Sequence, residues 1–318
     1  MVQVGSLHIS PELVNASCAW ASDLGQLQAL FDSPDTGAVL TRTSTLEGFQ
    51  EDASSHTVAF ASSSTTSLNS YGYSPHKLSQ YLSWIESILS AAATPKSKPF
   101  IISITASQPD VTRSTIDAIQ ALRSKGPAFA DIGIEFNTSC PNIRGSTPPG
   151  YAFTNLVPLL TVFADAWRAD NSLTLGLKLP PYVHAAQFAE VLDTLRQFST
   201  TADVDGHARN PIAYIACTNT LGNALLMITR LRYRRPLGGI AGDALHALAL
   251  GNVYSFARLL EAEDSASGLK NLVIIGIGGV TSAEAAARMR KAGASIVGSA
   301  TLFGKEGVRA FEIISGKH

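Results

Sequence analysis

The residues best suited to chemistry are two asparagines and a cysteine in the segment NTSCPN, residues 137–142. This segment directly follows residues 132–136, whose alternating character predicts a short β-strand. Asn137 and Asn142 can each donate and accept hydrogen bonds, so together they can recognise the edge of an amide-containing ring. Pro141 stiffens the turn that presents Cys140, and a thiol beside such a ring can move a proton or attack it. The alternative is a polar loop with a buried structural cysteine.

Lys178 lies inside the apolar run LGLKLPP, residues 175–181. A cation within such a strand is costly unless it is paired or used. It has two functional interpretations, a cation beside an electron-accepting ring or a Schiff-base amine in an aldolase-like barrel. The structural alternative is a lysine that points outward toward a carboxylate on a helix.

Two glycine turns follow the last apolar runs of the chain. Residues 276–279 read GIGG before a plausible helix start, and Gly298 with Ser299 repeats the arrangement one unit later. Backbone N–H groups at paired turns of this kind can form a phosphate cradle, because glycine lets the backbone approach an anion closely. The pair favours a ligand with a single phosphate, such as FMN. Two ordinary tight turns are the alternative.

Short β-branched runs alternate with longer amphipathic stretches from about residue 36 to the end. Strands are predicted at 38–41, 100–104, 132–136, 175–179, 212–217, 272–275 and 295–297. Helices are predicted near 79–92, 110–124, 154–169, 185–198, 243–263, 282–292 and 305–314. Strands separated by helices pair in parallel. With no GxGxxG motif opening the first helix, the order predicts an α/β fold, a (β/α)8 TIM barrel, over a doubly wound sheet.

One strand of this barrel is hard to place, and residues 237–242 are a candidate for it. The Ser- and Thr-rich residues 43–78 predict an elaborated loop over the C-terminal face, and residues 199–211 a polar insertion. Neither has a clean linker composition, so residues 1–318 are expected to form a single domain. The strand ends of a barrel share one site, which here collects Arg42, Asn137, Lys178 and Asn219, with Asn69 on the first loop. This set suits a flat anionic heterocycle.

Composition excludes several classes of function. The net charge of -1 and the lack of a Lys/Arg stripe argue against a nucleic-acid surface, since the only basic cluster lies at residues 230–235. The 3 cysteines are too scattered for a disulfide framework, and the 7 histidines show no metal-ligand spacing, so no metal is expected. With no apolar run of membrane-spanning length, the protein is expected to be soluble and cytoplasmic.

Many short motifs in one order resemble class 1 dihydroorotate dehydrogenases, FMN-dependent barrels of pyrimidine synthesis, and specifically the fumarate-using class 1A branch. The resemblance covers nearly the whole chain. It rests on NAS at 15–17, STLE at 44–47, NSYG at 69–72, NTSCPN at 137–142, KLPPY at 178–182, NTLGN at 219–223, GGIAG at 238–242, GIGG at 276–279 and GSA at 298–300.

The resemblance implies FMN-dependent oxidation of (S)-dihydroorotate to orotate, with fumarate as electron acceptor, by a cytoplasmic homodimer. Cys140 matches the base that removes the C5 proton while a hydride leaves C6 for the flavin, and Lys178 matches the cation at the flavin N1–C2 edge. The substrate-binding residues implied are Arg42, Asn69, Tyr71, Gly72, Asn137, Asn142, Asn219 and Thr220. The cofactor-binding residues implied are Ala16, Ser17, Arg42, Lys178, Gly239, Gly278, Gly279, Gly298 and Ser299.

Several positions depart from the family pattern near the expected site. Arg42 stands where the family has lysine, Cys18 where it has glycine, and Thr220 where it has serine. A guanidinium is larger and forked, so the geometry of the pocket is open to change. These departures motivate an alternative function, a related flavin enzyme acting on another dihydropyrimidine or cyclic amide. Two further alternatives are a flavin-free lyase that uses Lys178 as a Schiff-base amine and a non-catalytic binding barrel.

Overall fold

The computed structural model describes residues 1–52, 56–92, 98–140, 142, 147–201, 207–226 and 237–317. Pro141, the arginines of residues 230–235 and part of the predicted insertion at 199–211 lie outside the described residues.

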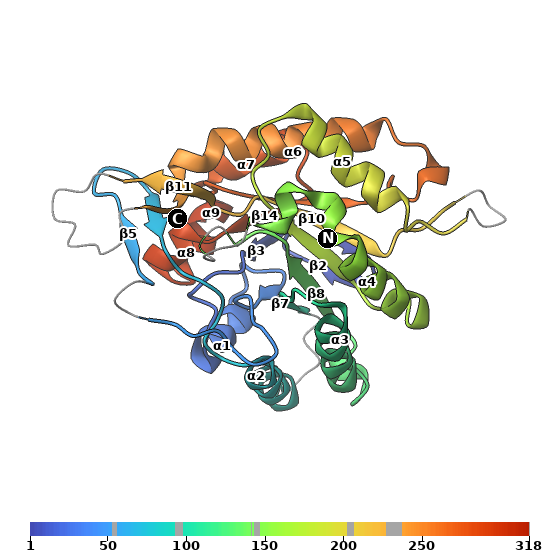
Figure 1. Ribbon diagram of the computed structural model, residues 1–318. Coiled ribbons are helices and arrows are strands. Elements are labelled where there is room, and N and C mark those ends of the chain that lie inside the picture. Colours follow the sequence, from blue (N-terminus) through green and yellow to red (C-terminus); the bar gives the residue numbers. More distant parts are fainter. Residues whose placement is uncertain are drawn as a thin grey trace.

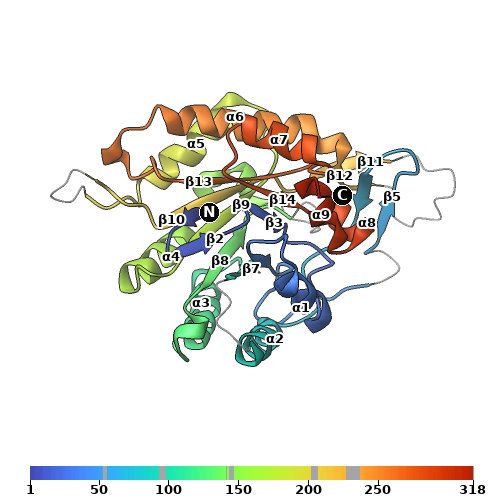
Figure 2. The same ribbon diagram turned by 180° about the vertical axis from the view of Figure 1, so that it is seen from behind.

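Eight parallel strands form the central sheet, in the hydrogen-bonded order β3-β14-β13-β10-β9-β8-β7-β4. Their bounds are Leu13–Asn15 (β3), Val39–Leu40 (β4), Phe100–Ile104 (β7), Ile132–Asn137 (β8), Leu175–Leu179 (β9), Ile212–Cys217 (β10), Val273–Ile277 (β13) and Ile296–Ser299 (β14). Helices surround this sheet (Figures 1 and 2). The prediction of a (β/α)8 barrel is therefore confirmed.

The helices are α1 (Leu24–Asp32), α2 (Leu78–Ala91), α3 (Pro109–Arg123), α4 (Val157–Ala169), α5 (Ala185–Arg196), α6 (His246–Glu261), α7 (Ala283–Lys291), α8 (Thr301–Glu306) and α9 (Arg309–Ser315). Short 3-10 helices cover Pro127–Phe129, Pro149–Tyr151, Phe153–Leu156, Asp243–Leu245 and Ser265–Ser267. N-cap residues explain where two of these helices begin. The Asp23 side chain accepts a backbone N–H at the start of α1, and the Ser282 side chain does the same for α7. The single helix predicted at 305–314 is wrong, because Gly307 has a φ of 60° and separates α8 from α9.

A second sheet of four antiparallel strands packs beside the barrel, in the order β11-β12-β6-β5. Its strands are β5 (Val58–Phe60), β6 (Thr66–Asn69), β11 (Leu221–Leu225) and β12 (Leu237–Gly242). Figure 1 shows this sheet at one side of the molecule, next to α8. Residues 237–242 do form a strand, but their assignment to the barrel was wrong. The remaining barrel strand is β3, which pairs with β14.

Side-chain alternation divides the core into two parts. Phe100, Ile102 and Ile104 of β7 pack outward against the helices, whereas Ile101 belongs to the cluster inside the barrel. The antiparallel hairpin of β1 (Val2–Val4) and β2 (Leu7–Ile9) contributes buried apolar side chains to the inner cluster. It therefore closes the barrel opposite the carboxyl ends of the strands.

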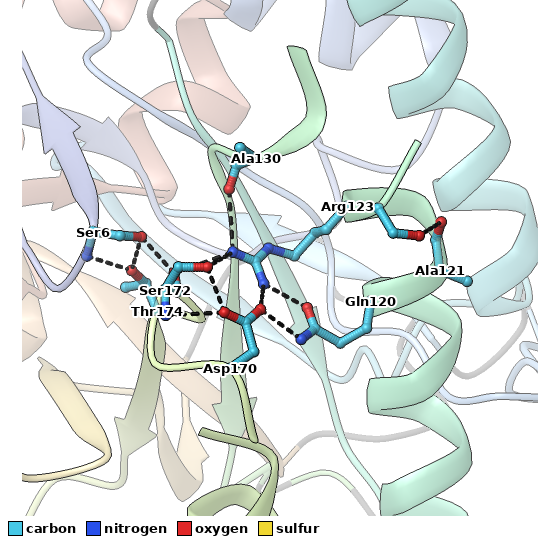
Figure 3. A network of polar contacts seen from close by, with 9 residues as sticks. Ser6, Gln120, Ala121, Arg123, Ala130, Asp170, Ser172 and Thr174 are labelled. Atoms are coloured by element: carbon cyan, nitrogen blue, oxygen red, sulfur yellow. Dashed lines mark hydrogen bonds and ion pairs between the residues drawn. The ribbon is translucent and has the colours of Figure 1, made fainter. Parts of the chain in front are cut away.

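An ion pair between the buried Arg123 and the half-buried Asp170 fastens the amino ends of β8 and β9 to α3 (Figure 3). Arg123 Nη1 donates to Asp170 Oδ2 at 2.6 Å, and Nη2 donates to the Ser172 carbonyl at 3.1 Å and the Ala130 carbonyl at 3.4 Å. Gln120 donates to the same Asp170 oxygen at 2.8 Å. These contacts satisfy the two terminal nitrogens of a guanidinium that solvent barely reaches, whereas its buried Nε has no hydrogen-bond partner among the described residues. They lie at the end of the barrel away from the strand termini that carry the candidate site.

The barrel closes between β3 and β4 through one side chain. Asn15 Nδ2 donates to the Leu40 carbonyl at 2.6 Å, and Asn15 Oδ1 accepts the Leu40 N–H at 2.9 Å. A backbone bond from Gly37 N to the Leu13 carbonyl at 2.8 Å supports the same seam. The fully buried carboxamide thus takes the place of ladder hydrogen bonds that these short strands do not form with each other.

Replacing Asn15 by Ala should lower the free energy of unfolding by about 2–4 kcal/mol, because two buried backbone groups of Leu40 lose their partner. Chemical denaturation would measure the change, with Asn155→Ala as a matched control at an exposed asparagine. Equal stabilities for the two variants would show that the seam does not depend on this carboxamide.

Candidate functional site

The carboxyl ends of the barrel strands surround one open pocket with about 960 Å³ of space not filled by atoms, including space open to solvent. Every residue predicted for the site lines it except Gly239: Ala16, Ser17, Arg42, Asn69, Tyr71, Gly72, Asn137, Cys140, Asn142, Lys178, Asn219, Thr220, Gly278, Gly279, Gly298 and Ser299. Gly239 lies behind the pocket on β12, where its carbonyl accepts Asn69 Nδ2 at 3.2 Å.

Lys178 points into the barrel, because its neighbours Leu177 and Leu179 pack in the outer core. The side chain is only 5% exposed, and Nζ donates to the Ser17 carbonyl at 3.0 Å. The alternative of a lysine directed outward to a helix carboxylate is therefore wrong. An ammonium held at the pocket floor can stabilise negative charge on a bound ring.

Two of the carboxamides are locked to each other at the pocket floor. Asn137 Oδ1 accepts Asn219 Nδ2 at 3.1 Å and the Ser139 N–H at 3.1 Å, and Asn137 Nδ2 donates to Thr43 Oγ1 at 2.9 Å. Asn219 Nδ2 also donates to the Ser139 carbonyl at 2.7 Å. These bonds fix which end of each amide faces the pocket.

The other two carboxamides lie where the second sheet meets the barrel. Asn142 Nδ2 donates to Asn69 Oδ1 at 3.1 Å and to the Tyr71 carbonyl at 2.7 Å. Asn69 ends β6 and pairs in register with Gly239 of β12. The wall opposite the floor is therefore built by the second sheet, and the four asparagines approach one space from two directions.

Cys140 is half-buried at the pocket, and its thiol donates to the Tyr71 carbonyl at 3.8 Å. Burial raises its pKa above the ordinary value, and the Asn142 N–H and the charges of Lys178 and Arg42 oppose that rise. Cys18 also lines the pocket, and burial raises its pKa to about 11. Both thiols are therefore protonated near neutral pH in the ligand-free protein.

Arg42 lies two residues beyond the end of β4, and its guanidinium already has partners. The residue is 6% exposed, and Nη2 donates to Glu51 Oε1 at 2.6 Å and to the Tyr73 carbonyl at 3.2 Å. The guanidinium carbon lies 5.3 Å from the centre of the Tyr71 ring. Glu51 thus partly neutralises the charge of Arg42 beside the pocket. A lysine at this position would place its charge with a different geometry.

The glycine turns close the side of the pocket at β13 and β14. Gly278 and Gly279 have φ values of 127° and 66°, which favour glycine. A Cβ on Gly279 would lie 2.5 Å from His246 Cβ and 2.8 Å from the Gly242 carbonyl oxygen. Ser299 Oγ donates to the Val280 carbonyl at 2.8 Å, which ties the two turns together. The result is a backbone-lined cradle suited to an anion.

Sequence reasoning missed several residues of the site. Thr43, Ser67, Tyr73, Thr218, Leu245 and Thr301 also line the pocket. Glu51 partners Arg42 from the elaborated loop, and Glu135 lies buried beneath the floor. The sequence did contain a signal for Glu135. Residues two apart on a strand share a face, so Glu135 must face the same way as Asn137, which faces the pocket.

Within the described ranges, no group of three or more His, Cys, Asp or Glu side chains is arranged to hold a metal ion. In the same part of the chain, no helix combines the length and apolar character needed to cross a bilayer.

Comparisons with known proteins show the family of the chain. The family model described as dihydroorotate dehydrogenase matches residues 13–317. A relative from Streptococcus pyogenes serotype M18 is 26% identical over 316 residues, which are 98% of this chain and 90% of that protein. Another from Streptococcus pneumoniae serotype 4 is 26% identical over 319 residues, 99% of this chain and 90% of that protein. Both relatives carry the name dihydroorotate dehydrogenase A (fumarate).

Replacing Gly279 by Ala should destabilise the protein by about 1–3 kcal/mol, because a side chain there is strained and clashes with His246 and the Gly242 backbone. Gly251→Ala is the matched control, since Gly251 lies exposed in α6 and a Cβ there meets nothing within 4 Å. That control should gain up to about 1 kcal/mol. Chemical denaturation measures the free energy of unfolding of both variants. A loss confined to Gly279→Ala would show that the tight turn requires glycine, and equal values for the two variants would contradict this.

Proposed function

The chain belongs to the dihydroorotate dehydrogenase family, and from that premise we propose that it oxidises (S)-dihydroorotate to orotate with FMN as cofactor and fumarate as electron acceptor. The observation that carries the proposal is the convergence of the Cys140 thiol, four carboxamides and the Lys178 ammonium on one pocket. The flavin-free lyase would also use Lys178, but it gives no role to the thiol or to the asparagines.

The residues present fit FMN. The cradle formed by Gly278, Gly279 and Gly298 suits its phosphate, because these residues line the pocket with backbone alone and let it approach an anion closely. Lys178 and the Ser17 backbone lie at the floor, where the cation would face the ring edge that gains negative charge. When bound, the flavin supplies an acceptor for the hydride that leaves C6 of the substrate.

The protein's own groups supply the proton chemistry and the orientation. Asn69, Asn137, Asn142 and Asn219 would hold the dihydropyrimidine ring so that its C5 proton faces Cys140. The Cys140 thiolate would take that proton onto Sγ, with the neighbouring Asn142 N–H and the Lys178 and Arg42 charges favouring the thiolate form. Since burial disfavours the thiolate, deprotonation of Cys140 is the step that must precede each turnover.

Fumarate as acceptor rests on the names of the Streptococcus relatives and on the charge of the pocket. Arg42 and Lys178 are the cations that line it among the described residues, and both suit a substrate with carboxylates. We propose that fumarate enters the pocket after orotate leaves. A cytoplasmic homodimer belongs to the same proposal, and sedimentation of the purified protein would test the oligomeric state.

Anaerobic dihydroorotate should bleach the visible flavin band of the purified protein, and fumarate should restore it. Cys140→Ser should slow the bleaching at neutral pH by about 10²-fold or more, because a serine hydroxyl ionises far less readily than a thiol and so supplies almost no anionic base. Stopped-flow absorbance measures both rates. Cys18→Ser is the control, because Cys18 lines the pocket without an expected role as base. A band that dihydroorotate leaves yellow would overturn the proposed substrate while keeping the flavin.

The rate of flavin bleaching should rise with pH, by about tenfold per unit below the pKa of the base. The sign follows from the need for a thiolate, and the raised pKa of Cys140 places the end of the rise above the ordinary range for a cysteine. Stopped-flow rates across a pH series measure the profile. A rate that is flat with pH in the wild-type protein would argue against Cys140 as the base.

A further inference from the structure

The peptide bond between Gly278 and Gly279 is the part of the glycine cradle that its own residues constrain least. Neither residue has a Cβ, so little within them opposes a rotation of this peptide plane that exchanges the directions of its carbonyl and its N–H. The peptide is trans, and the two groups of a trans peptide point in opposite directions. When one of them is held outside the pocket, the other therefore faces the pocket that both residues line.

The chain before and after this peptide is held by other parts of the barrel. The Ile277 carbonyl accepts a backbone N–H at 2.6 Å, and the Val280 carbonyl accepts a serine hydroxyl at 2.8 Å. Among the described residues, the peptide between them has one partner, His246, whose Nδ1 lies 2.8 Å from the Gly278 carbonyl oxygen. The Gly279 N–H has no partner in the same part of the chain, so it is available to a ligand.

The tautomer of His246 follows from a second contact of its ring. Arg288 Nε donates to His246 Nε2 at 3.2 Å, and an arginine stays protonated, so Nε2 must be the acceptor. The ring is then neutral and carries its proton on Nδ1, which donates to the Gly278 carbonyl. A proton on Nε2 would instead face the hydrogen of Arg288 Nε.

This tautomer selects between the two orientations of the glycine peptide. A rotated peptide would present the Gly279 N–H to His246, which would need an acceptor at Nδ1 and therefore a proton on Nε2, where Arg288 opposes it. The rotation would also turn the Gly278 carbonyl away from His246 and toward the pocket, where its oxygen would repel an anion. The bonds of the imidazole thus favour the orientation that offers an N–H to the pocket.

His246 reaches this turn from outside the pocket. It is the first residue of α6, and it is not among the residues that line the cavity. A Cβ on Gly279 would lie 2.5 Å from His246 Cβ, so the missing side chain is what lets the helix and the turn approach closely. Because the backbones are this close, the imidazole can contact the Gly278 carbonyl directly.

We propose that His246 is a positioning residue for the phosphate of the cofactor: its Nδ1–H holds the Gly278 carbonyl outside the pocket and so directs the Gly279 N–H toward the anion. Arg288 fixes the tautomer that makes this bond possible. The inference rests on the proposed function for the identity of the anion as the phosphate of FMN. It predicts an effect confined to flavins that carry this phosphate.

Two flavins separate this role from a general effect on the pocket, because riboflavin has the ring and the ribityl chain of FMN without the phosphate. His246→Leu removes the donor and keeps an apolar side chain. His246→Asn restores an amide nitrogen attached to Cγ, as Nδ1 is in histidine. His8→Leu is the matched control at an exposed histidine of β2. Fluorescence titration of the full-length protein, freed of flavin, gives each Kd.

The FMN Kd should rise about tenfold in His246→Leu, because a peptide that is free to rotate donates less often to the phosphate. The riboflavin Kd should stay within about twofold of wild type. His246→Asn should recover most of the FMN affinity, and His8→Leu should match wild type for both flavins. An unchanged FMN Kd in His246→Leu, equal weakening of both flavins, or an Asn variant no better than Leu would overturn the proposal.

A second readout needs no flavin. In histidine-labelled protein, the ring nitrogen signals of His246, assigned by their loss in His246→Asn, should show the proton on Nδ1, and a proton on Nε2 would overturn the proposal. Failure of dihydroorotate to bleach the flavin would count against the proposed substrate and leave this role intact. Wild-type protein that binds FMN no more tightly than riboflavin would overturn the role of the cradle and of His246 together.

Discussion

Closure of the parallel sheet is the constraint on which the rest of the structure depends. Once β3 and β4 are joined, the carboxyl ends of all eight strands lie on one rim, and residues far apart in the chain become neighbours. The seam is made chiefly by the Asn15 side chain and one backbone bond, because β4 spans only Val39–Leu40. The geometry of the site therefore depends on this seam, although the Asn15 side chain contacts Leu40 and is not itself a residue of the site.

Polar groups below the rim give the pocket its orientation. A barrel interior filled with branched apolar side chains would pack well, but it would leave the amides above it free to turn. Here Ser103, Thr43 and Glu135 occupy part of that interior, and hydrogen bonds link them to one another and to Asn137. The barrel thus gives up apolar burial in one sector and gains a fixed pattern of donors and acceptors at the floor.

The sequence predicted most of the barrel because buried parallel strands such as Phe100–Ile104 are rich in apolar residues and separated by helices. It misplaced one strand because Leu13–Asn15 is short, while Leu237–Gly242 has strand composition that does not reveal which sheet it joins. Strand-end positions located Asn137, Lys178 and Asn219, since parallel pairing fixes where a strand end lies. Glu51 was missed because its contact with Arg42 depends on the path of a long loop, which no periodicity encodes.

The second sheet has a consequence for how such an enzyme can diverge. Asn69, and the backbone that holds it, belong to β6 and β12, whereas Lys178 and the glycine cradle belong to the barrel. One wall of the pocket is therefore built on a different scaffold from the floor and the glycine cradle. Changes in the antiparallel sheet can reshape that wall while Asn137, Asn219 and Lys178 stay in place on the barrel. A lineage built on this plan can acquire new specificities by revising a peripheral module, without passing through variants that have lost their cofactor.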